Sequence, residues 1–172
     1  MFAVHDDEDS SSFKTKILLG STGSPYLFAY DVVTETWETI ADDFKSFSGV
    51  TRPVLRHKKL YWIAHGIAVY DLVLKRMFTG PIIGKFNEVL LSTPLEVGYR
   101  PVVFHIDRDE FCCIWMDAHE YEHPQPVCCT TIRISEPLYK NGGKHSVKGH
   151  CLFTQRYLVD QTTIWYLFGL VL

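Results

Sequence analysis

The chain has 172 residues and a formal net charge of -3; 47% of its residues are hydrophobic and 22% are charged. This length is typical of one domain with a sizeable core, and the composition excludes a fully disordered protein. A slightly negative chain is also not expected to bind nucleic acid by charge alone. Aromatic residues make up 14% of the chain and favour β-sheet, because these side chains suit a pleated surface.

The N-terminal segment, residues 1–15, begins with the acidic sequence MFAVHDDEDSSS. It has neither the basic start nor the apolar core of a signal peptide, so we expect a disordered, acidic leader. We expect a single β domain over residues 16–172.

Two segments of the domain repeat each other. Residues 26–37 read YLFAYDVVTETW and residues 66–77 read GIAVYDLVLKRM, so Tyr30-Asp31 and Tyr70-Asp71 lie 40 residues apart. Trp37 and Met77 each follow the Asp by six residues. A strand-like stretch and a Gly-bearing turn precede each copy, and the pattern predicts strand, turn, strand, turn and strand.

The repeated residue types have a physical reason. The Tyr is expected to point between neighbouring sheets, the Asp to accept hydrogen bonds from the following turn, and the Trp to fill the next gap. A sheet with two apolar faces needs a neighbour on each side, and a period near 40 is typical of propeller blades. We expect the fold to be defined by Tyr30, Asp31, Trp37, Tyr70, Asp71, Met77 and, further along the chain, Trp115.

Further strands are predicted downstream. The expected strands are Pro101–His105, Glu110–Met116, Val127–Ile134, Cys151–Leu158 and Ile164–Leu172. A tight turn is expected at Asp107-Arg108-Asp109, and a long loop, DAHEYEHPQP, is expected to join the second strand to the third. Gly84–Leu91 is left open between a helical turn and a strand.

These sequences resemble a known family. The stretch SPYLFAYDVVTETWETI resembles the second half of a kelch repeat, and KKLYWIAHGIAVYDLVLKRMFTG and VFHIDRDEFCCIWMD are similar to plant F-box-associated β-propeller domains. The resemblance covers about residues 16–134. The double Gly of kelch blades is absent and Met77 replaces the second Trp, which favours the F-box-associated class.

The resemblance implies a fold and a function. The fold is an all-β, propeller-like set of antiparallel sheets, incomplete at about three to four blades. The function is protein–protein interaction, namely substrate recruitment in an F-box ubiquitin ligase. No F-box motif precedes Lys16, so a Skp-type adaptor is expected as a partner only if an F-box is supplied elsewhere. If the chain is a truncated product, exposed sheet edges are expected to favour self-association.

Cysteine and histidine are the residues most suited to chemistry. The five cysteines form two adjacent pairs and a single residue, which indicates reduced thiols in the cytoplasm or nucleus. His119 and His123 lie near Cys128 and Cys129, but adjacent strand residues point to opposite faces and do not easily share one metal. We therefore expect no enzyme activity, no metal and no cofactor. The alternative is a metal-binding protein or a galactose-oxidase-like propeller enzyme that uses this loop.

Partner contacts are expected in the loops that join the strands, because binding surfaces of propellers are built there. The partner is expected to be an unidentified protein, and neither nucleic acid nor a membrane is expected to bind. The apolar C-terminal stretch TIWYLFGLVL is only about half as long as a membrane helix. The candidate contact residues are Asp107, Arg108, His119, Tyr121, His123, Asn141 and Lys144.

Overall fold

The computed structural model describes residues 2–4, 16–20, 26–42, 52–63, 66–84, 101–116, 125–135, 138–139 and 145–159. These residues contain strands and turns but no helix, and accordingly none of them forms a helix that is long and apolar enough to cross a membrane. The strands are β1 Phe2–Val4, β2 Lys16–Gly20, β3 Leu27–Asp31, β4 Thr36–Ala41, β5 Val54–Arg56, β6 Lys59–Ile63, β7 Ile67–Asp71, β8 Arg76–Gly80, β9 Ile82–Ile83, β10 Val102–Asp107, β11 Glu110–Met116, β12 Gln125–Ile134, β13 Leu138–Tyr139, β14 His145–Ser146 and β15 Gly149–Val159.

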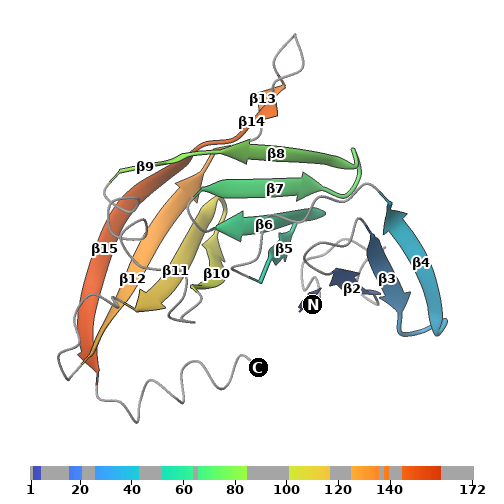
Figure 1. The fold of residues 1–172 in the computed structure, drawn as a ribbon, viewed down its shortest axis with the longest axis horizontal. Coiled ribbons are helices and arrows are strands. Elements are labelled where there is room, and N and C mark those ends of the chain that lie inside the picture. The colour runs from blue at the N-terminus through green and yellow to red at the C-terminus, as the bar shows by residue number, and fades with distance from the viewer. Residues whose placement is uncertain are drawn as a thin grey trace.

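The strands form three sheets (Figure 1). The first sheet has the order β1-β2-β3-β4, and the middle sheet has the order β13-β14-β8-β7-β6-β5. The third sheet has the order β10-β11-β12-β15-β9. All neighbouring strands are antiparallel except the pairs β14–β8 and β15–β9. The predicted all-β fold with antiparallel sheets is therefore confirmed.

The sequence repeat corresponds to two units of the same register. In the first unit, β2–β4, Tyr30 pairs with Trp37 and Asp31 with Thr36. In the second unit, β6–β8, the same rows are Tyr70 with Met77 and Asp71 with Arg76. A lysine lies opposite each Asp, because Lys16 pairs with Asp31 and Lys59 with Asp71. The two units therefore share the strand order, the register and the turn between their last two strands, whereas the connection between their first two strands is longer in the first unit.

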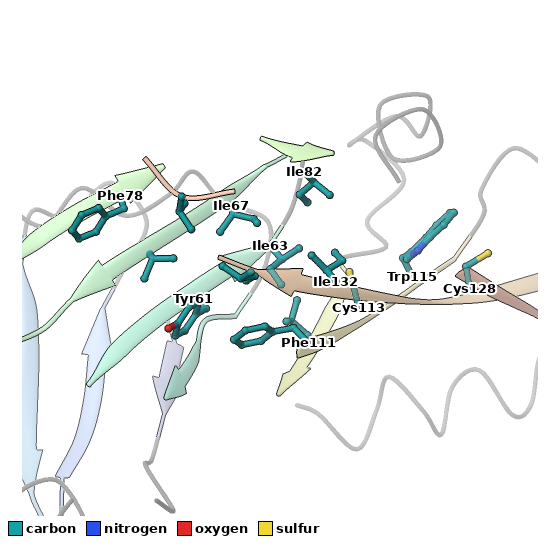
Figure 2. Packing of buried hydrophobic residues seen from close by; sticks show 14 residues of the cluster. Tyr61, Ile63, Ile67, Phe78, Ile82, Phe111, Cys113, Trp115, Cys128 and Ile132 are labelled. Carbon is teal, nitrogen blue, oxygen red and sulfur yellow. The ribbon is translucent and has the colours of Figure 1, made fainter. Parts of the chain in front are cut away.

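The middle sheet is buried on both faces. One face packs on the first sheet in a cluster formed by Leu18, Leu27, Ala29, Ala41, Leu60, Trp62, Ala68, Tyr70 and Leu72. The other face packs on the third sheet, in a cluster that includes Ile63, Phe78, Phe111, Cys113 and Ile132 (Figure 2). All five residues of β7 are buried, as its nearly unbroken apolar sequence requires.

Two chain segments join the middle and third sheets at one corner. One segment passes from β8 through Pro81 into β9, and the other passes from β14 into β15. The segments run parallel, and the N–H of Gly149 donates to the carbonyl of Pro81 at 3.1 Å. A Cβ on Gly80 would lie 1.6 Å from the carbonyl oxygen of Val147, so only glycine permits this approach. The middle and third sheets consequently curl around their shared core (Figure 1).

The expected positions of Tyr30 and Trp37 between sheets are wrong, because both lie on the outer face of the first sheet. The Trp37 side chain is 59% exposed and lies against Tyr30, with ring centroids 4.9 Å apart. The reason is that β4 is an edge strand and that Trp37 lies on the face of the first sheet that does not pack on the middle sheet. Trp115 is buried as expected, and its Nε1 donates to the Thr130 hydroxyl at 3.0 Å.

Four of the five strands predicted downstream lie within the described residues, and one lies outside them. Strands were found at three of the expected places, as β10, β11 and β12, and the predicted strand Cys151–Leu158 lies within β15. The strand expected over Ile164–Leu172 lies outside the described residues, as do residues 85–91 of the segment left open. Within the expected leader, Phe2–Val4 form β1 and pair with β2, whereas residues 5–15 lie outside the description.

Candidate functional site

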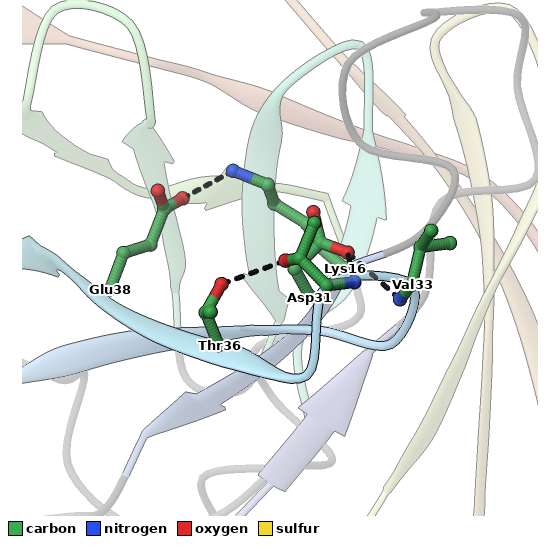
Figure 3. A network of polar contacts seen from close by, with 6 residues as sticks. Lys16, Asp31, Val33, Thr36 and Glu38 are labelled. Atoms are coloured by element: carbon green, nitrogen blue, oxygen red, sulfur yellow. Dashed lines mark hydrogen bonds and ion pairs between the residues drawn. The ribbon is translucent and has the colours of Figure 1, made fainter.

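The turn after β3 is organised by a single carboxylate (Figure 3). One oxygen of Asp31 accepts hydrogen bonds from the backbone N–H groups of Val33 at 2.9 Å and Thr34 at 3.1 Å. These two bonds are the main reason why the pKa of Asp31 is lowered, and the nearby Lys16 lowers it further. Lys16 also forms a 2.6 Å ion pair with Glu38 on the same face of the sheet.

The turn after β7 repeats this arrangement. One oxygen of Asp71 accepts from the backbone N–H groups of Val73 and Leu74, both at 2.9 Å. The last turn residue has a positive φ in both units, 54° at Glu35 and 50° at Lys75. The predicted role of the repeated Asp as a turn acceptor is therefore present in both copies.

A basic cluster, called here the basic end, lies at the end of the middle sheet that carries the turn after β7. The β5–β6 hairpin turns through His57 and Lys58, which both have positive φ. The N–H of Leu72 donates to the carbonyl of Lys58 at 2.9 Å, so the β5–β6 and β7–β8 turns lie side by side. The basic end comprises Arg56, His57, Lys58, Lys59, Lys75 and Arg76.

The basic end is partly accessible to solvent. His57, Lys75 and Arg76 are exposed, and the other members are partly buried. The Nε of Arg56 is buried and has no hydrogen-bond partner in the part of the chain that the structure describes. At the equivalent turn of the first unit, Glu35 and Thr36 replace Lys75 and Arg76. Two turns of one backbone shape therefore present different charges.

This cluster was not predicted from the sequence. Its members come from two runs, Arg56–Lys59 and Lys75–Arg76, which only the β5–β8 meander brings together. The available signal was that Lys75–Arg76 lies at the turn predicted after Tyr70-Asp71 and that Arg56–Lys59 precedes the strand-like stretch of the same copy. Antiparallel strands place alternate turns at the same end of a sheet.

Two of the predicted partner residues lie in the β10–β11 turn. Arg108 has a φ of 41°, and its carbonyl oxygen lies 3.2 Å from the ring Nε2 of His105. Asp107 ends β10, and the N–H of Ile134 donates to the neighbouring Asp109 carbonyl at 2.8 Å. β10 lies beside β5, the strand that leads into the basic end. The other predicted residues, His119, Tyr121, His123, Asn141 and Lys144, lie outside the described residues.

The four cysteines of β11 and β12 point to two faces. Cys113 and Cys128 are buried in the core shared with the middle sheet, whereas Cys112 and Cys129 lie half-buried on the other face. Burial raises the pKa of Cys112, Cys113 and Cys129. Cys128 and Cys129 thus point to opposite faces, as expected. The described residues contain no cluster of three or more His, Cys, Asp or Glu side chains that could hold a metal ion.

Comparisons with family models, curated proteins and solved structures found no match to this chain.

Proposed function

We propose that the chain is a protein-interaction module whose basic end binds an acidic segment of a partner protein. The observation that carries this proposal is that the turns after β3 and β7 have the same backbone shape, but among the described residues only the second unit presents a cluster of cationic side chains at its turns. A fixed frame with turns of differing charge is typical of binding modules, in which rigid strands position variable loops.

The proposal includes the propeller-like fold and the cellular role that the resemblance implies. The three sheets would be successive blades of an incomplete propeller, supported by the 40-residue repeat and by the face-to-face packing of the sheets. The role would be substrate recruitment in an F-box ubiquitin ligase of the cytoplasm or nucleus. Binding of a Skp-type adaptor would then require an F-box from another segment or chain.

A binding role rather than catalysis is favoured by the state of the thiols. A nucleophilic cysteine is normally activated by a lowered pKa or an adjacent base. Three of the described thiols instead have raised pKa values, and burial is the main cause for each.

The test is the binding of a fluorescent peptide rich in Asp and Glu, followed by anisotropy with the full chain. Replacing Lys75→Glu and Arg76→Thr together copies the residues of the first unit onto the same turn geometry, so the fold is expected to persist. We expect this double variant to weaken binding about tenfold, since two exposed charges together contribute about 1–2 kcal/mol. We expect the matched control Lys148→Glu, an exposed lysine at the other end of β8, to retain binding.

Three results would contradict the proposal. The first is equal binding by the double variant and the wild type, and the second is equal loss in the Lys148→Glu control. The third is tighter binding of a single-stranded RNA of the same charge, which would identify a nucleic-acid surface. The ubiquitin-ligase role is tested separately, by adaptor binding of the chain alone and fused to an F-box, and only the fusion is expected to bind.

A further inference from the structure

One face of the first sheet packs on the middle sheet, and the opposite face is called here the aromatic face. Register places two rows of side chains on it, Ile17–Tyr30–Trp37 and Leu19–Phe28–Thr39. Trp37 is 59% and Phe28 is 37% exposed, and Tyr30 lies against Trp37. The opposite face carries Leu18 and Ala29, which are buried against the middle sheet.

The internal repeat indicates what covers a face of this kind. The equivalent rows of the second unit are Leu60–Tyr70–Met77 and Trp62–Ala68–Thr79. The apolar residues of these rows pack against the first sheet, and Tyr70 and Trp62 are almost completely buried. The same side of the repeat is therefore covered by a β-sheet in one unit and exposed in the other.

The chemistry of the aromatic face suits a second copy of itself. None of the six side chains in its two rows is charged, so pairing two such faces desolvates no ion. Tyr30, Trp37 and Thr39 carry polar atoms at the surface, and these can form hydrogen bonds across an interface. A patch that pairs with its own copy forms a closed twofold dimer, the commonest symmetry of protein oligomers.

We propose that two copies of this chain associate through their aromatic faces, first sheet against first sheet. The three strands β2–β4, at about five residues each, cover about 240 Å² in projection. This is smaller than the roughly 800 Å² that each partner contributes to a standard interface, so we expect the association to be weak and to depend on protein concentration. The proposal goes beyond the acidic-partner function and is independent of it, because the basic end lies on the middle sheet.

The test is sedimentation equilibrium of the full chain from about 1 to 300 µM, a range chosen for micromolar association. We expect the wild type to shift from monomer to dimer. Trp37→Glu and Thr39→Glu place a charge on the aromatic face at exposed positions, and each is expected to weaken dimerisation about tenfold or more. The matched control is Val33→Glu, which adds the same charge to an apolar residue of the β3–β4 turn that is 71% exposed.

A mixing experiment identifies the surface. Trp37→Glu and Trp37→Lys copies are each expected to remain monomeric alone and to associate when mixed, because opposite charges then meet across the same face. A wild type that stays monomeric over the whole range would overturn the proposal. Dimerisation that Trp37→Glu and Thr39→Glu leave unchanged would also overturn it, since the interface would then lie elsewhere.

Discussion

The two repeated units differ in burial although their backbones match. Tyr70 is almost completely buried between two sheets, whereas Tyr30 is half-buried beside an exposed Trp37. The Asp-centred turn and the strand register are the same in both. Local sequence therefore sets the turn and the register, whereas the neighbouring sheet decides whether the same position belongs to a core or to a surface.

The largest expected difference in stability between the units concerns Gly80 and Ala41, which occupy equivalent positions because they pair with Ile67 and Leu27. A methyl group at Gly80 would collide with the Val147 carbonyl, so we expect Gly80→Ala to lower the free energy of unfolding by about 3 kcal/mol or more. The reverse exchange, Ala41→Gly, is expected to cost only about 1 kcal/mol. Urea denaturation measures both, and similar losses would show that the corner between the sheets does not constrain Gly80.

The next difference concerns the repeated tyrosine. Tyr70→Ala empties a fully enclosed site and is expected to lower stability by about 3–5 kcal/mol. Tyr30→Ala removes a half-buried ring and is expected to cost about 1 kcal/mol at protein concentrations that keep the chain monomeric. Thermal unfolding of the two variants under the same conditions compares them directly. Equal losses would mean that both faces are covered to the same extent.

A smaller effect is expected from the pH dependence of the first turn. The pKa of Asp31 is lower in the folded state, so its carboxylate stabilises the fold above the unfolded-state pKa of about 3.9. This contribution is lost as the pH falls through the folded-state pKa. We expect Asp31→Asn to unfold at less urea than the wild type at pH 7, and the difference to shrink toward pH 2. Asp42→Asn, an exposed residue after β4, serves as the control and is expected to show no such trend.

The smallest effect is expected in the third sheet, where alkylation compares the reactivity of half-buried and buried thiols in the wild-type chain. Burial raises the pKa of Cys112 and Cys129, so both thiols are protonated at pH 7. We expect slow alkylation by iodoacetamide that rises about tenfold per pH unit toward alkaline pH. Cys113 is fully buried and is expected to react only in the unfolded chain. Peptide mapping by mass spectrometry measures each site, and rapid labelling of Cys112 at pH 7 would contradict the raised pKa.

Sequence patterns predicted the parts of the structure that depend on neighbours along the chain. The Tyr-Asp repeat, the Asp turn acceptors and the long hairpin between β11 and β12 follow from alternation, turn chemistry and spacing. The opposite orientation of adjacent cysteines follows from the pleat. These features need no knowledge of which sheets pack together.

The features that escaped prediction depend on distant segments. The exposure of Trp37 depends on which face of the first sheet meets the middle sheet, and Met77 at the equivalent position is partly buried. The basic end forms because the β5–β6 and β7–β8 turns lie side by side at one end of the sheet. The parallel pairings at the corner join residues such as Thr79 and Ser146. Each pairing involves one two-residue strand, β14 or β9, which is too short to show a sequence pattern.

The pairing of β8 with β14 also affects the order in which the chain can fold during synthesis. At roughly 5–20 residues per second, Ser146 follows Thr79 out of the ribosome by about 3–13 s. During that time the first sheet and the β5–β8 meander can already form from local contacts, whereas the outer edge of β8 has no strand to pair with. Nascent chains that stop before β14 therefore carry an open β edge, the kind of surface that chaperones shield and that leads to aggregation when it is left unprotected.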